Sequence, residues 1–438
     1  MVEGFRRKRW MPRLNKGEGV SVLLATAWLF FLLLGYFVIR PVRETLGSLV
    51  DSDDLKLRFY ASFLTMLAAV PAYGFLVNSL SRRWLVRVVY QAFALCLVGF
   101  WVFLRSESEV VQAWAAWVLF VWISFFGVFA TTVFWSVLAD LFSSRQAKRL
   151  FGFVAAGGTV GALVGSLLTS QLAQLLSKDQ FMLLPIVVIE LGLLCAWMLE
   201  KQAAVLTQAD SQSGVVEVET TVPPARGGWL SAVTHIFRSR YLQFICVFIF
   251  FVQFCGTQMY FEQAAIVKAA LPSESARRQL FANIDLATQV LTLVAQVFLA
   301  SFILRFGGVA VALMVLPAIY LCSFSALAFN SSLQVMVVAV VIGRSAGYGI
   351  TVPAREVLFT VVKREDKYKS KGFIDTVVLR GSDAASASAF TGLEGWGLRA
   401  LNLCLLPIVA IWLFVSWRLG RYQEELAETQ EATTKEQR

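Results

Sequence analysis

Long apolar stretches alternate with short polar connections along most of the 438-residue chain. A helix needs roughly 20 apolar residues to cross the hydrocarbon core of a bilayer. Twelve stretches of about this length predict an all-α membrane protein with 12 transmembrane helices. They cover residues 19–39, 58–80, 84–104, 110–140, 149–176, 180–199, 241–267, 279–304, 308–329, 332–361, 371–392 and 399–418.

The longest polar interruption, residues 200–228, falls at the middle of the chain and is rich in Gln, Ser, Thr and Glu. Residues 229–240 then mix apolar and basic positions, which is typical of a helix lying along the membrane surface. We therefore expect an N-terminal six-helix half (1–199), a cytoplasmic linker with an interfacial helix (200–240), a C-terminal six-helix half (241–418) and a cytoplasmic tail (419–438). This is a six-plus-six layout, in which two parallel six-helix halves rock around a central cavity.

The composition agrees with a membrane protein, because 58% of residues are hydrophobic and only 16% are charged. No cleavage site follows the first span, so we expect this span to remain as an anchor. The six cysteines lie in predicted spans without C-x-x-C spacing, and His235 is the only histidine. The chain therefore predicts no disulfide framework, no metal site and no cofactor.

The formal charge of +10 is distributed by topology rather than gathered into a nucleic-acid surface. Basic residues cluster before the first predicted span and after the second, fourth and tenth, whereas DSDD (51–54) and SESE (106–109) lie in the opposite connections. The positive-inside rule then predicts cytoplasmic N- and C-termini in a bacterial inner membrane. Arg277 and Arg278 fall in a predicted outer connection and go against this trend.

The stretch QAKRLFGFVAAGGTVGALVG (146–165) sets basic residues beside glycines. A phosphate-binding P-loop needs its lysine after the glycines, and here the basic residues come first. Gly157, Gly161 and Gly165 instead recur every four residues, on one face of the fifth predicted span. Such spacing predicts close helix packing, either as a fixed contact or as one that slides when the two halves rock.

Charged residues inside predicted spans are candidates for function, because a charge in the hydrocarbon zone must be paired, hydrated or used. Arg40 and Arg43 lie three residues apart, so they share a helix face and could grip a phosphate or carboxylate. Alternatively they reach the headgroups or pair with Glu44. Arg344 interrupts VMVVAVVIGRSAGYGI (335–350) and is either a substrate anchor or one member of a buried ion pair.

Acidic residues in the spans could carry a proton or balance a cation. Glu262 and Asp285 are the principal candidates, and Glu190, embedded in IVVIELGLL, is a further one because we expect protein and lipid to desolvate it. Arg380 and Asp383 are spaced for an intrahelical salt bridge, which leaves Asp375 as the freer acid of the eleventh span.

Three blocks carry a family resemblance: RPVRETLGSLV (40–50), FWSVLADLFSSRQAKRLFGFVAAGGTVGALVG (134–165) and REDKYKSKGFIDTVVLRGSD (364–383). The chain resembles the bacterial and plastid ATP/ADP translocase family, a nucleotide transporter branch of the major facilitator superfamily. The resemblance covers nearly the whole chain in order. It implies a twelve-helix alternating-access carrier that exchanges ATP against ADP.

The resemblance also implies roles for individual residues. Arg43 matches a family lysine at the end of the first span, and Lys369 or Lys371 matches a second lysine before the eleventh span. Two family glutamates inside spans have no acidic counterpart at the matching positions. The first would fall near Ile123 or Ser124, and the second near Tyr260, with Glu262 displaced by two positions.

Together these features predict a monomeric secondary active transporter, embedded in the lipid bilayer, for a small anionic and phosphate-bearing solute. The sequence contains no recognisable pair of a nucleophile and a base, so we do not expect an enzyme. Two alternatives stay open: a proton-driven exporter or lipid-related carrier, and a membrane partner protein that does not transport. The candidate substrate-binding residues are Arg40, Arg43, Tyr260, Glu262, Asp285, Arg344, Lys371 and Asp375.

Overall fold

The computed structural model describes residues 18–142, 144–202, 239–362 and 374–436, and these residues form helices without any strand. The predicted interfacial helix at 229–240 lies almost wholly outside the described residues, as does most of the predicted linker. Helices occupy all twelve predicted spans. Ten of the described helices are long and apolar enough to cross a membrane, and the other two predicted spans correspond to α2 and to η4 with α16.

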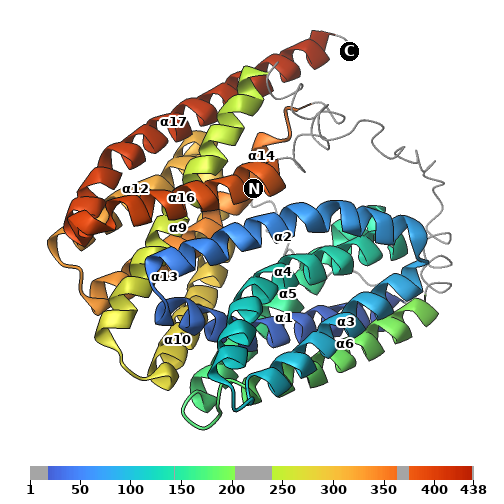
Figure 1. The fold of residues 1–438 in the computed structure, drawn as a ribbon. Coiled ribbons are helices and arrows are strands. Elements are labelled where there is room, and N and C mark those ends of the chain that lie inside the picture. The colour runs from blue at the N-terminus through green and yellow to red at the C-terminus, as the bar shows by residue number, and fades with distance from the viewer. Residues whose placement is uncertain (1–17, 143, 203–238, 363–373, 437–438) are drawn as a thin grey trace, which may run out of the picture. The chain divides into compact units, whose positions relative to one another are not determined.

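The N-terminal helices follow one another through short connections (Figure 1). They are α1 (Glu18–Leu49), α2 (Ser52–Ser79), α3 (Arg82–Phe103), α4 (Glu109–Leu141), α5 (Ser144–Leu172) and α6 (Leu183–Lys201), the last preceded by the short 3₁₀ helix η1 (Gln180–Met182). The helix of the first span ends ten residues beyond the end of the predicted apolar run. Its helix continues through Arg40 and Pro41 to Leu49.

The C-terminal helices include several segments in which the helix widens into a π-helix. They are α9 (Arg240–Ala270), α10 (Glu274–Val294) with η2 (Ala295–Ala300) and α11 (Ser301–Phe306), α12 (Gly308–Phe329), α13 (Leu333–Ala346) with η3 (Gly347–Thr351) and α14 (Val352–Leu358), η4 (Ile374–Val378) with α16 (Leu379–Leu393), and α17 (Leu398–Glu436). Because π-bulges are frequent at functional sites, η3, which begins three residues after Arg344, is notable.

The chain divides into two compact units. Unit 1 contains α1 as far as Val42 and the helices from Ala72 to α6. Unit 2 contains residues Arg43–Pro71 and the helices from α9 to α17. The end of α1 and the start of α2 therefore belong to the unit that contains the C-terminal helices.

In unit 1, α5 packs closely against α1 through the predicted glycine face. A Cβ added at Gly165 would lie 2.6 Å from the carbonyl oxygen of Leu34, and one added at Gly161 would overlap the carbonyl of Phe30. Gly157 meets Thr26 in the same way. The predicted packing face is confirmed, since only residues without a side chain let the two backbones come this close.

In unit 2, the buried Arg277 binds the C-terminal end of α1. Arg277 donates to the carbonyl oxygens of Ser48 and Leu271, each at 2.7 Å. Arg277 and Arg278 are both buried in the first turns of α10. The two exceptions to the charge trend thus lie inside the protein, and Arg277 satisfies backbone carbonyls there.

At the same end of unit 2, Lys268 lies 2.8 Å from Asp51, which is exposed between α1 and α2. The hydrogen bond from Lys268, together with its positive charge, lowers the pKa of the Asp51 carboxyl below its ordinary value. Ser52 donates to Glu394 at 2.5 Å, which adds a further polar contact between this connection and the end of α16.

Candidate functional site

Arg43 lies in the last turns of α1 and faces aromatic residues of unit 2. Its guanidinium carbon is 5.3 Å from the centroid of the Tyr260 ring and 6.0 Å from that of Phe59. Its Nη1 is 3.3 Å from Oε1 of Glu44, so the predicted pairing with Glu44 is present. The Arg43 side chain is only 15% exposed, which means that protein rather than lipid surrounds it.

Arg344 forms a second buried group of polar side chains. Its Nη1 lies 3.5 Å from Oδ1 of Asp285 on α10, and its Nη2 donates to Oε1 of Gln263 on α9 at 3.3 Å. Asp285 is 1% exposed and Arg344 is 17% exposed. The ion pair that was one of two alternatives for Arg344 is therefore observed. Such a pair offsets much of the cost of burying either charge.

Helix α9 connects these two groups. Tyr260 and Gln263 lie three residues apart and so share one helix face. Arg43 contacts the first of them and Arg344 the second. Two guanidiniums from α1 and α13 thus converge on one face of α9, and we call Arg43, Glu44, Tyr260, Gln263, Asp285 and Arg344 the arginine cluster.

Glu262 is buried, and its hydrogen-bond partner is not a member of the arginine cluster. Its Oε1 accepts a hydrogen bond of 2.6 Å from the amide of Asn402 on α17. Neither residue has any exposed surface, and within the described residues Oε2 of Glu262 has no hydrogen-bond partner. The sequence prediction grouped Glu262 with Asp285, whereas the structure directs the two carboxylates to different helices.

The remaining predicted residues occupy separate places. Arg40 belongs to unit 1, where its guanidinium lies 5.4 Å from the centroid of the Phe37 ring. Lys371 lies outside the described residues, and Asp375 is in η4 with its side chain outside the description. The predicted salt bridge between Arg380 and Asp383 is confirmed at 3.1 Å.

Several polar partners were missed by the sequence analysis. Asp383 also accepts hydrogen bonds from Gln253 at 2.7 Å and from Thr257 at 2.5 Å, both on α9. Asn402 was missed too, although it is an amide within the apolar run of the last span. A buried amide needs a hydrogen-bond partner, so this residue could have been recognised as the donor to a buried acid.

Glu190 lies on the surface of unit 1, and its desolvation by lipid stays a prediction. Both of its carboxylate oxygens accept hydrogen bonds of 3.0 Å from the amide of Gln91 on α3.

Comparison with known proteins identifies the fold. Residues 19–370 match the family model of the Major Facilitator Superfamily. No curated protein matches the chain in sequence.

Three solved structures illustrate the similarity. One is a bacterial homologue of the human lysosomal transporter Spinster, inward-facing and unoccupied (TM-score 0.57, 16% identity, 94% of this chain and 99% of that chain). Another is the nucleoside transporter NupG (TM-score 0.59, 14% identity, 92% and 99%). A third is a POT family transporter in complex with 5-aminolevulinic acid (TM-score 0.62, 10% identity, 94% and 97%). At these identities the similarity is one of fold.

Proposed function

Because the chain belongs to the major facilitator superfamily, we propose that it is a secondary transporter that carries an anionic, phosphate-bearing solute by alternating access. A nucleotide is the solute we favour. Two observations support this choice: the three sequence blocks resemble ATP/ADP translocases, and a nucleoside transporter is among the proteins of similar fold.

The convergence of Arg43 and Arg344 on one face of α9 is the observation that carries the proposal. Guanidinium groups bind phosphate through paired, charge-assisted hydrogen bonds, and they stay charged even when buried. Both arginines are enclosed by protein, so an anion that reached them would meet donors in a medium of low dielectric constant.

Glu44 and Asp285 give the arginine cluster a neutral state in which no solute is bound. Each acid lies within 3.5 Å of one arginine. A phosphate that entered would compete with these carboxylates for the guanidiniums. Exchange of one anion for another at the same arginines leaves the charge of the cluster unchanged, which suits an ATP:ADP antiporter.

Uptake by proteoliposomes tests the proposal. Vesicles that contain ADP and the purified protein are offered labelled ATP, and we expect uptake that depends on the internal ADP. Loss of one charge-assisted hydrogen bond costs about 1.5–3 kcal/mol, so Arg43→Gln and Arg344→Gln should each weaken apparent affinity about 10- to 150-fold.

Arg305→Gln is the matched control, because Arg305 also lies over an aromatic ring, that of Phe306, but is exposed at the end of α11. It should transport like the unmodified protein. Absence of uptake with any nucleotide or other phosphorylated solute inside the vesicles would refute the phosphate assignment. Equal loss in all three variants would refute the role of the arginine cluster.

A second candidate is a proton-driven carrier, which the Glu262–Asn402 pair favours. A carboxyl group that is wholly buried, with one oxygen unpaired among the described residues, is better accommodated when it is protonated. In this case an imposed pH gradient should drive uptake, and an uncoupler and Glu262→Gln should each abolish the driven component. If ADP-dependent exchange persists in Glu262→Gln, the antiporter is retained and this candidate is rejected.

The location and the interactions of the protein complete the proposal. The positive-inside pattern supports a bacterial inner membrane in which both termini are cytoplasmic. We propose that the protein works as a monomer with its small solute as its ligand. Lys371 and Asp375 remain proposed substrate contacts on the basis of the sequence resemblance.

A further inference from the structure

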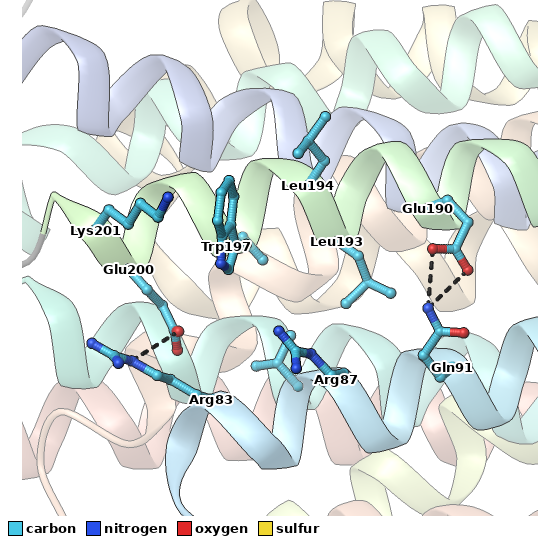
Figure 2. Close-up of a pocket in the computed structure, with 11 residues that line it drawn as sticks. Arg83, Arg87, Gln91, Glu190, Leu193, Leu194, Trp197, Glu200 and Lys201 are labelled. Atoms are coloured by element: carbon cyan, nitrogen blue, oxygen red, sulfur yellow. Dashed lines mark hydrogen bonds and ion pairs between the residues drawn. The ribbon is translucent and has the colours of Figure 1, made fainter.

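A pocket of about 670 Å³ lies between α3 and α6 of unit 1, remote in the chain from the arginine cluster. Figure 2 shows that Arg83, Arg87 and Gln91 line it from α3, at every fourth position and hence on one face. From α6 come Glu190, Leu193, Leu194, Trp197, Glu200 and Lys201. A cavity of this size is ample for a small ligand or the headgroup of a lipid.

Three basic residues, Arg83, Arg87 and Lys201, line the pocket at or next to one end, and Arg82 lies beside Glu200 there. Arg82 and Arg83 share one acid, Glu200, with nitrogen–oxygen distances of 3.7 and 3.4 Å. Arg87 and Lys201 line the pocket without an ion pair or a hydrogen bond to any residue that the structure describes. This end of the pocket therefore carries a net positive charge that the described protein does not balance.

Arg87 and Lys201, which form no salt bridge with a described residue, lie over tryptophan rings. Arg87 is 5.3 Å from the ring centroid of Trp84, and Lys201 is 3.3 Å from that of Trp197. Both tryptophans are about half exposed. Tryptophan is enriched where a membrane protein crosses from hydrocarbon to headgroups. The rings thus place Arg87 and Lys201 at the level of the lipid phosphates.

The opposite end of the pocket has a different chemistry. Gln91 donates to both oxygens of Glu190, and this pair closes the pocket about 12 Å along α3 from Arg83, at 1.5 Å per residue. Leu193 and Leu194 line the space between the two ends. Leu194 is half exposed on the side of α6 that no described protein covers. This arrangement suits an amphipathic ligand that places its negative group at the basic end and its apolar part beside the leucines.

We propose that this pocket binds the headgroup of an anionic phospholipid, with Arg87 and Lys201 as the phosphate contacts and Leu193, Leu194 and Trp197 beside the lipid chains. Basic pockets between transmembrane helices on the cytoplasmic side bind such headgroups. The basic end of α3 and α6 is the end that the charge pattern predicts to be cytoplasmic. A zwitterionic headgroup fits less well, because Glu200, the acid at this end, already faces two arginines.

Native mass spectrometry of the purified protein, titrated with phosphatidylglycerol or phosphatidylcholine, tests the proposal. We expect one tightly bound phosphatidylglycerol molecule and much weaker binding of phosphatidylcholine. Arg87→Gln/Lys201→Gln should weaken phosphatidylglycerol binding about 30-fold, at about 1 kcal/mol for each basic residue near an anionic surface. Phosphatidylglycerol should also raise the thermal midpoint of the unmodified protein but not that of the double variant.

Two further variants make the result specific. Arg105→Gln removes an exposed arginine that lies 5.2 Å from the Trp101 ring centroid just beyond the other end of α3, and it should keep full lipid binding. Arg87→Lys/Lys201→Arg keeps both charges and should also bind, even if the glutamine variant folds poorly. Equal binding by the unmodified protein and a folded glutamine variant would overturn the proposal.

A lipid must also be distinguished from a soluble anion. Excess inorganic phosphate should leave the bound phosphatidylglycerol in place, because it lacks the chains that contact Leu193 and Leu194. Displacement of the lipid by phosphate, or equal retention of phosphatidylcholine, would overturn the lipid assignment. The arginine cluster contains no residue of this pocket, so either result leaves the proposed transport function to be judged by uptake alone.

Discussion

The guanidinium of Arg43 lies over the ring of Tyr260, with 5.3 Å between its carbon and the ring centroid. The carboxylate of Glu44 approaches the same guanidinium to 3.3 Å. A ring and an acid therefore hold one positive charge from two directions. Because Tyr260 is on α9, the position of this charge depends on a helix far away in the sequence.

Replacing Tyr260 tests the contribution of the ring. Tyr260→Phe keeps the aromatic face, whereas Tyr260→Leu removes it. A cation–π contact in a desolvated place contributes about 1–2 kcal/mol, so Leu should lower the free energy of unfolding by about this much relative to Phe. Unfolding of the detergent-solubilised protein by sodium dodecyl sulfate measures it. In an Arg43→Gln background the difference between Phe and Leu should shrink, and an unchanged difference would mean that it reflects packing alone.

The pair formed by Arg344 and Asp285 should behave as a unit. Arg344→Gln leaves Asp285 buried without its cation, and breaking a buried pair in this way costs about 3–5 kcal/mol. Adding Asp285→Asn removes the stranded charge, so the double variant should be more stable than the sum of the two single losses predicts. The same unfolding measurement on all four proteins gives the coupling energy, and strict additivity would show that the two side chains do not interact.

The close packing at the glycine face of α5 can be tested with a control substitution on the same helix. Gly161→Ala forces a methyl group against the Phe30 carbonyl, and overpacking of this kind costs about 1–3 kcal/mol. Gly152→Ala lies on the same helix with no atom within 4 Å of its added Cβ. It should be neutral or slightly stabilising, since alanine favours helix over glycine. Equal thermal midpoints for the two variants would contradict the close approach of α1 and α5.

The pair formed by Asp51 and Lys268 should depend on pH. Lys268 lowers the pKa of Asp51 in the folded protein, first through its hydrogen bond and then through its charge. The stabilisation is therefore fully present above the unfolded pKa of about 3.9 and is lost as pH falls through the lowered folded value.

The measurement is the difference in thermal midpoint between the unmodified protein and Asp51→Asn. It should be small, because the pair is exposed, constant near neutral pH, and should vanish in strong acid. A difference in thermal midpoint that grew as the pH fell would contradict the lowered pKa of Asp51.

The helices could be located from the sequence because a span must be long and continuously apolar, which leaves a strong local signal. Boundaries were less certain at the first span, where the apolar run ends near residue 39 and the helix continues to Leu49. Arg43 and Glu44 are charged, but they pair with one another and Arg43 also contacts Tyr260. These contacts let the helix continue past the apolar run.

The partners of the buried charges could be predicted only where they lie on one helix. Arg380 and Asp383 are three residues apart, and their bridge followed from helical spacing. Asp285 and Arg344, or Glu262 and Asn402, meet through the packing of different helices, which spacing along the chain does not encode. Glu190 shows the same limit, because its hydrogen-bond partner Gln91 lies on a different helix.

Main-chain oxygens of α1, rather than side chains, set its separation from α5 at Gly161 and Gly165. Tolerance to substitution should therefore differ between the two helices: many side chains can replace the half-buried Phe30 without a change in spacing, whereas one added methyl group at Gly161 or Gly165 cannot be accommodated. A saturation mutagenesis library of both helices should then show many tolerated substitutions on this face of α1 and few at the facing glycines of α5.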